Sequence, residues 1–155
     1  MNYYRRSNVI HIDGLPVFQQ PEDQQAEEEI AAKLSAIWNC QIKSFGMMAA
    51  IDWWAERHGM PVGVLELKRR NAPAAAWPNA ILNLRKWLAL TLASVGMHVP
   101  AVFVYKCTDK LFWIPTSEID ANRVIIGGCK THVKSSNDVE PVIMVPLKSF
   151  RELAP

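Results

Sequence analysis

Cysteine is scarce in this chain of 155 residues, and the few cysteines follow no ligand or disulfide pattern. They are odd in number and far apart in the sequence: Cys40, Cys107 and Cys129. No C-x-x-C pair and no Cys/His ligand spacing accompanies them, so neither a disulfide framework nor a structural zinc site is indicated. This cysteine usage is best explained by a reducing, cytoplasmic compartment.

Long apolar runs are missing as well. No apolar segment follows the residues Met1 to Ser7, so no secretory signal peptide is expected. The longest apolar stretch, residues 80–95, is interrupted by Asn83, Arg85 and Lys86. Because it is too short and too charged to span a bilayer, we expect no membrane partner.

Common sequence signatures of nucleotide and zinc sites are also absent. The chain contains no G-x-x-x-x-G-K-[ST] phosphate loop and no H-E-x-x-H zinc motif, and its four histidines are scattered. We therefore expect neither a P-loop nucleotide site nor a histidine-based zinc site.

Charge is unevenly distributed, although the net charge is only +2. Residues 7–32 carry acids and no lysine or arginine, whereas residues 67–108 carry basic side chains and no acid. The second region is the one that would attract a polyanion. The alternative, that each run is only a solvated face, stays open at this point.

Residue patterns predict one α/β (α+β) domain over residues 21–155, preceded by a flexible arm, residues 1–20. A helix should begin at Pro21, since acids occupy its first turns and apolar residues recur at helical spacing. A second helix is expected over residues 79–95, with Asn79 as its N-cap and burial on more than one side. Strands are expected at 41–45, 47–55, 61–69, 101–106, 110–115, 123–126 and 141–145, with a linker at 71–78.

Two predicted strands each contain a carboxylate among apolar residues, which is unfavourable unless something compensates the charge. These acids are Asp52 and Glu66. If residues 57–59 form a three-residue hairpin loop, Asp52 pairs with Val64, and Glu66 is its diagonal neighbour on the same face. Strand alternation places Lys68 on that face too, about 7 Å from Glu66.

Two carboxylates at this separation can share a hard divalent cation such as Mg²⁺. Lys68 beside them could orient an attacking water or stabilise charge on a phosphoryl group. The alternative is structural: Glu66 and Lys68 form an ion pair, and Asp52 caps a bulge. The basic, acid-free segment after these strands favours the catalytic interpretation.

The residues from Ile51-Asp52 to Glu66-Leu67-Lys68 resemble the motif of the PD-(D/E)xK nuclease superfamily. The likeness extends to the order αβββαβ and, in small phage-encoded members, to Trp77-Pro78 and the helical segment Leu84-Arg85-Lys86-Trp87. It covers about residues 26–115. The motif departs from the family in having Ile51 where many members have proline. The resemblance implies a restriction-endonuclease-like mixed sheet with helices packed on it.

The resemblance also implies a metal-dependent hydrolase of phosphodiester bonds, with Asp52, Glu66 and Lys68 as its catalytic residues. It implies Mg²⁺ or Mn²⁺ as the cofactor, bound by the two carboxylates and the backbone carbonyl of Leu67. Many relatives add a glutamate from the first helix, for which Glu27 is a candidate here, in competition with its two neighbouring glutamates.

Nucleic acid, and specifically DNA, is the expected partner. Candidate contacts are the basic, aromatic and amide side chains around the motif: Arg69, Arg70, Trp77, Asn83 and Lys86. If the chain is phage-encoded, it would act in the cytoplasm of a bacterial host. Two other classes stay open: a non-catalytic nucleic-acid-binding or host-enzyme-inhibiting protein on this fold, and a structural subunit. Self-association into a homo-oligomer is also open.

Overall fold

The computed structural model describes residues 10–12, 15–17, 21–46, 49–128 and 139–154. The chain divides into two compact units, Met1–Ile42 and Lys43–Pro155.

The N-terminal unit contains a short hairpin and one long helix. Strands β1 (Ile10–Ile12) and β2 (Leu15–Val17) pair antiparallel. Helix α1 (Pro21–Trp38) begins at the predicted residue and buries Ile30 and Leu34, one turn apart. The hairpin lies inside the segment expected to be a flexible arm, and the proposed boundary between arm and domain stays a prediction.

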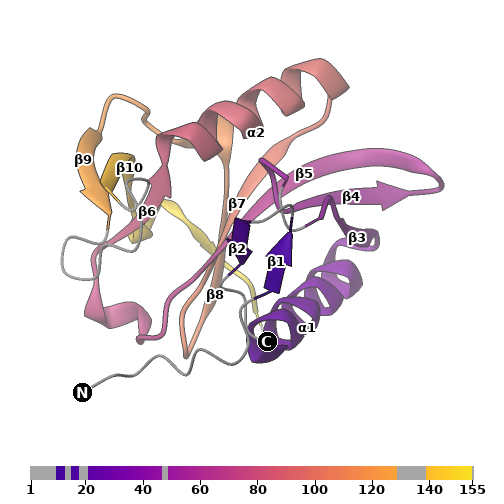
Figure 1. Ribbon diagram of the computed structural model, residues 1–155, viewed down its shortest axis with the longest axis horizontal. Helices are drawn as coiled ribbons and strands as arrows, with labels where there is room; N and C mark the ends of the chain where they lie inside the picture. The colour runs from indigo at the N-terminus through magenta and orange to yellow at the C-terminus, as the bar shows by residue number, and fades with distance from the viewer. Residues whose placement is uncertain (1–9, 13–14, 18–20, 47–48, 129–138, 155) are drawn as a thin grey trace. The chain divides into compact units, whose positions relative to one another are not determined.

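A mixed sheet of six strands carries the larger unit (Figure 1). Its order is β11-β8-β7-β5-β4-β3. The β4–β5 and β7–β8 pairs are antiparallel, whereas β5 and β7 run parallel. The bounds are β3 (Gln41–Ser44), β4 (Trp53–Arg57), β5 (Met60–Arg69), β7 (Ala101–Lys106), β8 (Leu111–Pro115) and β11 (Arg151–Glu152). The predicted mixed α/β (α+β) architecture is thus confirmed.

The connection between the parallel strands β5 and β7 contains β6 (Asn79–Asn83) and α2 (Leu84–Met97). Helix α2 packs against both β5 and β7 (Figure 1). The predicted helix start at Asn79 is wrong, because residues 79–83 form a strand and Asn83 occupies the N-cap position. The strand forms because it pairs with β10, a partner about sixty residues away that local patterns do not reveal.

Strand β6 belongs to a second sheet, of order β6-β10-β9. Strands β9 (Val124–Gly128) and β10 (Val139–Pro146) extend the strands predicted at 123–126 and 141–145. Both pairings in this sheet are antiparallel. This sheet fixes where α2 begins and therefore which side chains of α2 reach β5.

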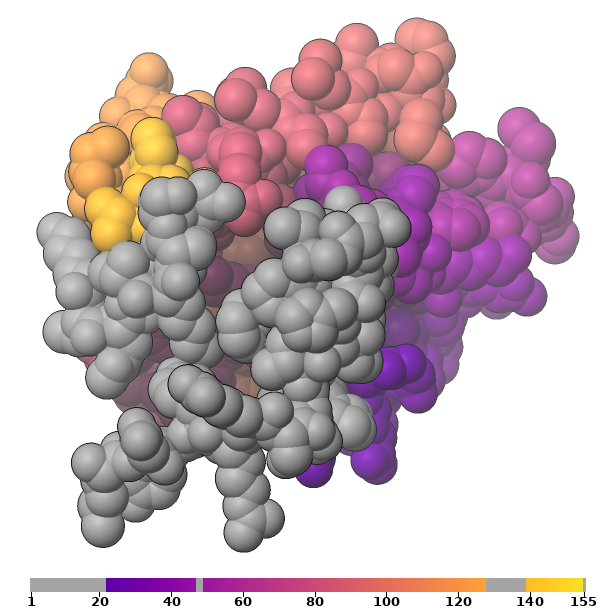
Figure 2. Space-filling model, viewed as in Figure 1, coloured from indigo at the N-terminus to yellow at the C-terminus, as the bar shows by residue number. Residues whose placement is uncertain are grey.

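Helix α2 is more exposed than its composition predicts. Leu90 is fully buried, but Leu88, Leu92 and Val95 are exposed, Leu92 to 74%. The expectation of burial on more than one side is therefore wrong, since one apolar stripe faces the sheet and another faces solvent. Figure 2 shows α2 along one edge of the visible surface, with β9 beside its N-terminal end. A transmembrane span would need a longer and more apolar helix than either described helix provides.

Among the described residues, one core cluster lies between the two sheets and joins β7 and β8 to β6 and β10. Its members include aromatic and aliphatic side chains from all four strands: Phe103, Tyr105, Ile114, Leu82, Ile143 and Val145. Strand β5 is buried through its middle, where Val64 and Leu65 are almost fully enclosed. A rigid, central strand therefore carries the Glu66 position.

Gly127 in β9 is expected to be indispensable to this second sheet. A Cβ built there would come within 2.5 Å of the Cγ2 of Val142, a buried, β-branched side chain that cannot easily move. Gly127→Ala should therefore destabilise the protein by about 1–3 kcal/mol in chemical denaturation. The matched control is Gly96→Ala, where a Cβ meets nothing within 4 Å inside α2. That change should raise stability by about 0.5 kcal/mol. Equal effects of the two substitutions would contradict the close approach at Gly127.

Candidate active site

The β4–β5 hairpin closes through a two-residue turn rather than the predicted three-residue loop. Arg57 pairs with Met60, and His58 and Gly59 between them have φ values of 51° and 76°. Positive φ at both central residues is typical of the type I′ turn, whose twist matches that of the strands it joins. The predicted pairing of Asp52 with Val64 is therefore wrong, and Trp54 pairs with Val64 instead.

A β-bulge in the same hairpin offsets the shorter turn. Glu56 pairs with Pro61, but the next pair is Ala55 with Gly63, which leaves Val62 as an extra residue. A one-residue change in register moves a side chain to the other face, and a second change returns it. The turn and the bulge together shift the register by two residues. The side chains of Asp52 and Glu66 therefore still lie on one face of the hairpin.

Asp52 lies immediately before β4 rather than inside a strand. Its carbonyl accepts a hydrogen bond from the Phe45 N–H at 3.0 Å, and its carboxylate Oδ2 accepts one from the Leu67 N–H at 2.9 Å. The predicted strand at 47–55 therefore begins only at Trp53. The bond to Leu67 fixes the Asp52 carboxylate against β5, beside Glu66.

Lys86 of α2 bridges the two carboxylates. Its Nζ lies 2.9 Å from Glu66 Oε1, 3.0 Å from Glu66 Oε2 and 3.3 Å from Asp52 Oδ1. All three groups are largely withdrawn from solvent, with side-chain exposures of 10% for Glu66, 15% for Lys86 and 33% for Asp52. The structure thus unites two predicted metal ligands with a residue that was predicted to contact nucleic acid.

The pKa of Glu66 is raised to about 7 from its usual value near 4.5. Burial is the largest cause, the nearby Asp52 charge is the second, and Lys86 opposes both. The site therefore carries more negative charge than one ammonium offsets. Carboxyl groups whose pKa is raised by burial and by a neighbouring charge are common in catalytic and metal sites.

Lys68 follows Glu66 by two residues on β5, so it points to the same face of the strand. Its side chain reaches solvent, yet the surrounding protein desolvates the ammonium enough to lower its pKa. The negative charge of Glu66 is the main charge that opposes this lowering, whereas the positive charge of Arg70 lowers the pKa of Lys68 further. Lys68 therefore releases its proton more readily than an ordinary surface lysine.

A polar cluster next to the carboxylate site was not predicted from the sequence. Glu140 of β10 accepts hydrogen bonds from the Asn83 amide and from Arg85 Nε, the latter at 3.0 Å. The negative charge of Glu140 also opposes the lowering of the Lys68 pKa. Because the β6–β10 pairing places Val142 opposite Asn83, Glu140 arrives at the site through a non-local contact. No local pattern around Glu140 could have revealed this.

The basic residues after Lys68 gather at the end of β5. Arg69 ends the strand, and the Arg70 N–H donates to the Lys106 carbonyl at 2.8 Å. The Arg70 guanidinium lies 4.7 Å from the ring centroid of Trp77. The contact of Arg69, Arg70 and Trp77 with nucleic acid stays a prediction.

The residues present fit a hard divalent cation. Within the described residues no group of three or more His, Cys, Asp or Glu side chains could hold a metal, and Asp52 and Glu66 form a pair of carboxylates. Mg²⁺ needs only one or two carboxylates and keeps several waters. The N–H and C=O of a strand residue point to the same side, so the Leu67 carbonyl lies on the edge of β5 that faces Asp52. Glu27 is in α1, and its predicted role is untested.

Comparison with known proteins gives one family and one structural likeness of note. A family model described as "phage putative PDDEXK endonuclease" matches residues 15–153, which confirms the resemblance seen in the sequence. No curated protein matches the chain. Among solved structures, the chain is similar to Hjc, a Holliday junction resolvase from the archaeal hyperthermophile Archaeoglobus fulgidus. That match has 13% identity and a TM-score of 0.49, and it covers 63% of this chain and 79% of the resolvase chain.

The raised pKa of Glu66 predicts a pH-dependent stability. Between pH 4.5 and about 7 the folded chain keeps a proton on Glu66 that the unfolded chain releases. The free energy of unfolding should therefore fall as pH rises through this window, by at most about 1.4 kcal/mol per pH unit, and level off above it. Urea denaturation in a metal chelator checks this, with Glu66→Gln as the control that lacks the slope. The same slope in both proteins would assign the pH dependence to other groups.

Proposed function

The chain belongs to the phage PDDEXK endonuclease family, and we propose that it hydrolyses phosphodiester bonds of DNA with a divalent cation. The observation that carries the proposal is the pair of carboxylates, Asp52 and Glu66, held on one face with a single ammonium between them. Burial, and then repulsion between the two carboxylates, raises the pKa of Glu66. Such a pair binds a hard cation well because that cation neutralises both charges.

Asp52, Glu66 and the Leu67 carbonyl would hold Mg²⁺ or Mn²⁺. When bound, the cation acts as a Lewis acid on the phosphate and lowers the pKa of its water. The carboxylates fix the position of the cation relative to β5, and the Leu67 N–H orients Asp52 for this task. Glu27 is proposed only as an additional support from α1.

Lys68 is proposed to act on the attacking water or on the phosphate. It lies on the same face of β5 as Glu66, and its lowered pKa makes its proton easier to transfer. An ammonium held there by the protein also stabilises negative charge that develops on the phosphoryl oxygens. The exposure of its side chain leaves it accessible to a substrate.

Lys86 and a divalent cation compete for the same carboxylate oxygens. In the structure Lys86 offsets part of the negative charge of the two carboxylates, which makes it a built-in counter-ion. A cation held by the carboxylates would repel the Lys86 ammonium, and the long side chain of Lys86 would then be available to a substrate phosphate. Asn83, Arg69, Arg70 and Trp77 are proposed as further contacts to the DNA.

A phage nuclease of this kind would act on DNA in the cytoplasm of its bacterial host. One observation favours a second candidate, a DNA-binding protein without turnover. Lys86 contacts both carboxylates and offsets part of their charge, so the two acids can lie together without a bound cation. The two candidates differ in whether purified protein cleaves DNA at all.

Substitution of the carboxylates should abolish cleavage. Asp52→Asn and Glu66→Gln should each lower divalent-ion-dependent cleavage of plasmid and of linear single strands by about 100-fold or more. Calorimetric titration should show weaker Mn²⁺ binding in both variants. Glu56→Gln is the matched control, since Glu56 lies in the same hairpin but pairs with Lys43. DNA binding without cleavage by the unmodified protein, with either ion, would favour the second candidate.

Lys68→Ala separates the proposed role of the lysine from that of the ligands. Turnover should fall by about 100-fold, whereas Mn²⁺ binding and DNA binding should persist, because Lys68 acts on the water and the phosphate. Single-turnover cleavage and calorimetry on one preparation check this. Near-normal turnover would rule out a catalytic role for Lys68.

Lys86→Met tests the competition at the carboxylates. Removal of the ammonium should raise Mn²⁺ affinity by about tenfold, because the competing cation is lost. It should also lower the slope of DNA affinity against salt by about one phosphate contact. Arg85→Met is the matched control, since Arg85 is the neighbouring cation on α2 and pairs with Glu140. Unchanged or weaker Mn²⁺ binding in Lys86→Met would contradict the counter-ion role.

A further inference from the structure

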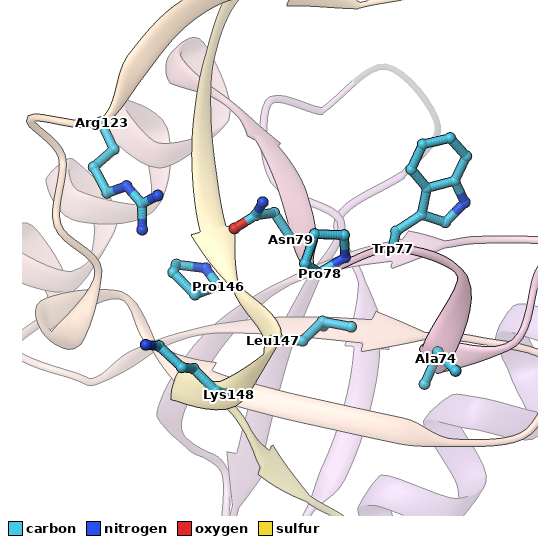
Figure 3. Close-up of a pocket in the computed structure, with 9 residues that line it drawn as sticks. Ala74, Trp77, Pro78, Asn79, Arg123, Pro146, Leu147 and Lys148 are labelled. Atoms are coloured by element: carbon cyan, nitrogen blue, oxygen red, sulfur yellow. The ribbon is translucent and has the colours of Figure 1, made fainter.

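A cavity of about 590 Å³ lies between the segment before β6 and the segments that flank β9 and β10. Figure 3 shows Arg123 and Lys148 at one end, Trp77 at the other, and Pro78 and Asn79 between them. Its volume is within the range of small-molecule sites, about 300–1,000 Å³. The lining residues are Ala74, Ala75, Trp77, Pro78, Asn79, Arg123, Pro146, Leu147 and Lys148.

The charge of this cavity has one sign. Arg123 and Lys148 are both exposed, and no acid is among the lining residues. Among the residues that the structure describes, neither cation makes an ion pair with a carboxylate. Asp120 lies close in the chain, but its carboxylate accepts two hydrogen bonds from Asn122 instead. Two uncompensated cations at one end of a cavity fit an anion.

The walls of the cavity are fixed by backbone pairing. Asn79 and Pro146 are partners in the β6–β10 ladder, and the Leu147 N–H donates to the Pro78 carbonyl at 2.9 Å. The Met144 N–H donates to the Arg123 carbonyl at 3.1 Å, which anchors the other wall. The two cations and Trp77 therefore project from a preformed frame, which lowers the entropic cost of binding a ligand.

Trp77 offers an open aromatic surface. The residue is 50% exposed, and the Arg70 guanidinium lies over one face of its ring, 4.7 Å from the centroid, so the opposite face is the one a base would contact. Arg70 follows the Lys68 strand directly, so the tryptophan end of the cavity continues the basic end of β5. An aromatic ring in line with cations is the arrangement by which proteins bind single strands without sequence preference.

We propose that this cavity binds a short single-stranded segment of the DNA substrate, with backbone phosphates at Arg123 and Lys148 and a base stacked on Trp77. This inference rests on the proposed function and adds a substrate class to it. A base inside a duplex has both faces covered by its neighbours, so away from the duplex end a tryptophan can stack only on an unpaired base. The enzyme should therefore prefer DNA that carries a single-stranded tail over blunt duplex.

Binding can be measured separately from cleavage. In a Glu66→Gln background, fluorescence anisotropy would compare a labelled blunt duplex with the same duplex carrying a single-stranded tail. The tailed duplex should bind more tightly, by at least about fivefold, which is the lower limit for one stacked base. Because no cleavage is needed, tail preference can hold even if the unmodified protein proves inactive. Equal affinity for both duplexes would overturn the proposal.

Variants assign that preference to the cavity. Trp77→Ala should remove at least about fivefold of the affinity for the tailed duplex, and Trp77→Phe should restore most of it. The double variant Arg123→Ala/Lys148→Ala should lower the salt slope for the tailed duplex by about 1.4, at about 0.7 per phosphate of a single strand. The double variant Lys110→Ala/Arg151→Ala, which removes two exposed cations outside the cavity, is the charge-matched control. A tail preference that survives in both cavity variants would place the single strand elsewhere.

Discussion

The contact of Lys86 with Asp52 and Glu66 determines how the rest of this site is built. The hairpin brings two carboxylates to one face, and without a cation between them their mutual repulsion in a buried setting would be severe. The ammonium that prevents this comes from α2, the helix between two parallel strands. The position of α2 therefore has to be specified as closely as that of the strands.

The second sheet provides that specification. Strand β6 ends at Asn83, directly before α2. Its pairing with β10 fixes the position of the first turn of the helix. The same pairing delivers Glu140 to Asn83 and Arg85, and it frames the cavity beside Trp77. One small sheet thus positions the counter-ion Lys86, the charge of Glu140 that acts on Lys68, and the cavity proposed to bind a single strand.

Local patterns in the sequence were sufficient to predict the central elements. Apolar strands interrupted by Asp52 and Glu66 predicted the carboxylate pair, even though the assumed hairpin register was wrong. The prediction of a shared face held because a shorter turn and a bulge at Val62 shift the register by two residues in total. The β7–β8 hairpin and the start of α1 at Pro21 also follow from alternation and from helix-start signals.

Features that depend on contacts distant in sequence could not be predicted in this way. Strand β6 looks like the first turn of a helix until its partner β10 is known, and Glu140 has no local mark of its role. The bridging position of Lys86 depends on how α2 packs, which helical periodicity does not define. The proposed competition between Lys86 and a divalent cation depends on this position.

Anomalous diffraction from a crystal soaked in Mn²⁺ tests this claim most directly. Competition between Lys86 and the cation predicts a manganese peak bonded to oxygens of both Asp52 and Glu66, with the Lys86 ammonium no longer bridging them. A map without manganese at this position, in which Lys86 still contacts both carboxylates, would contradict it.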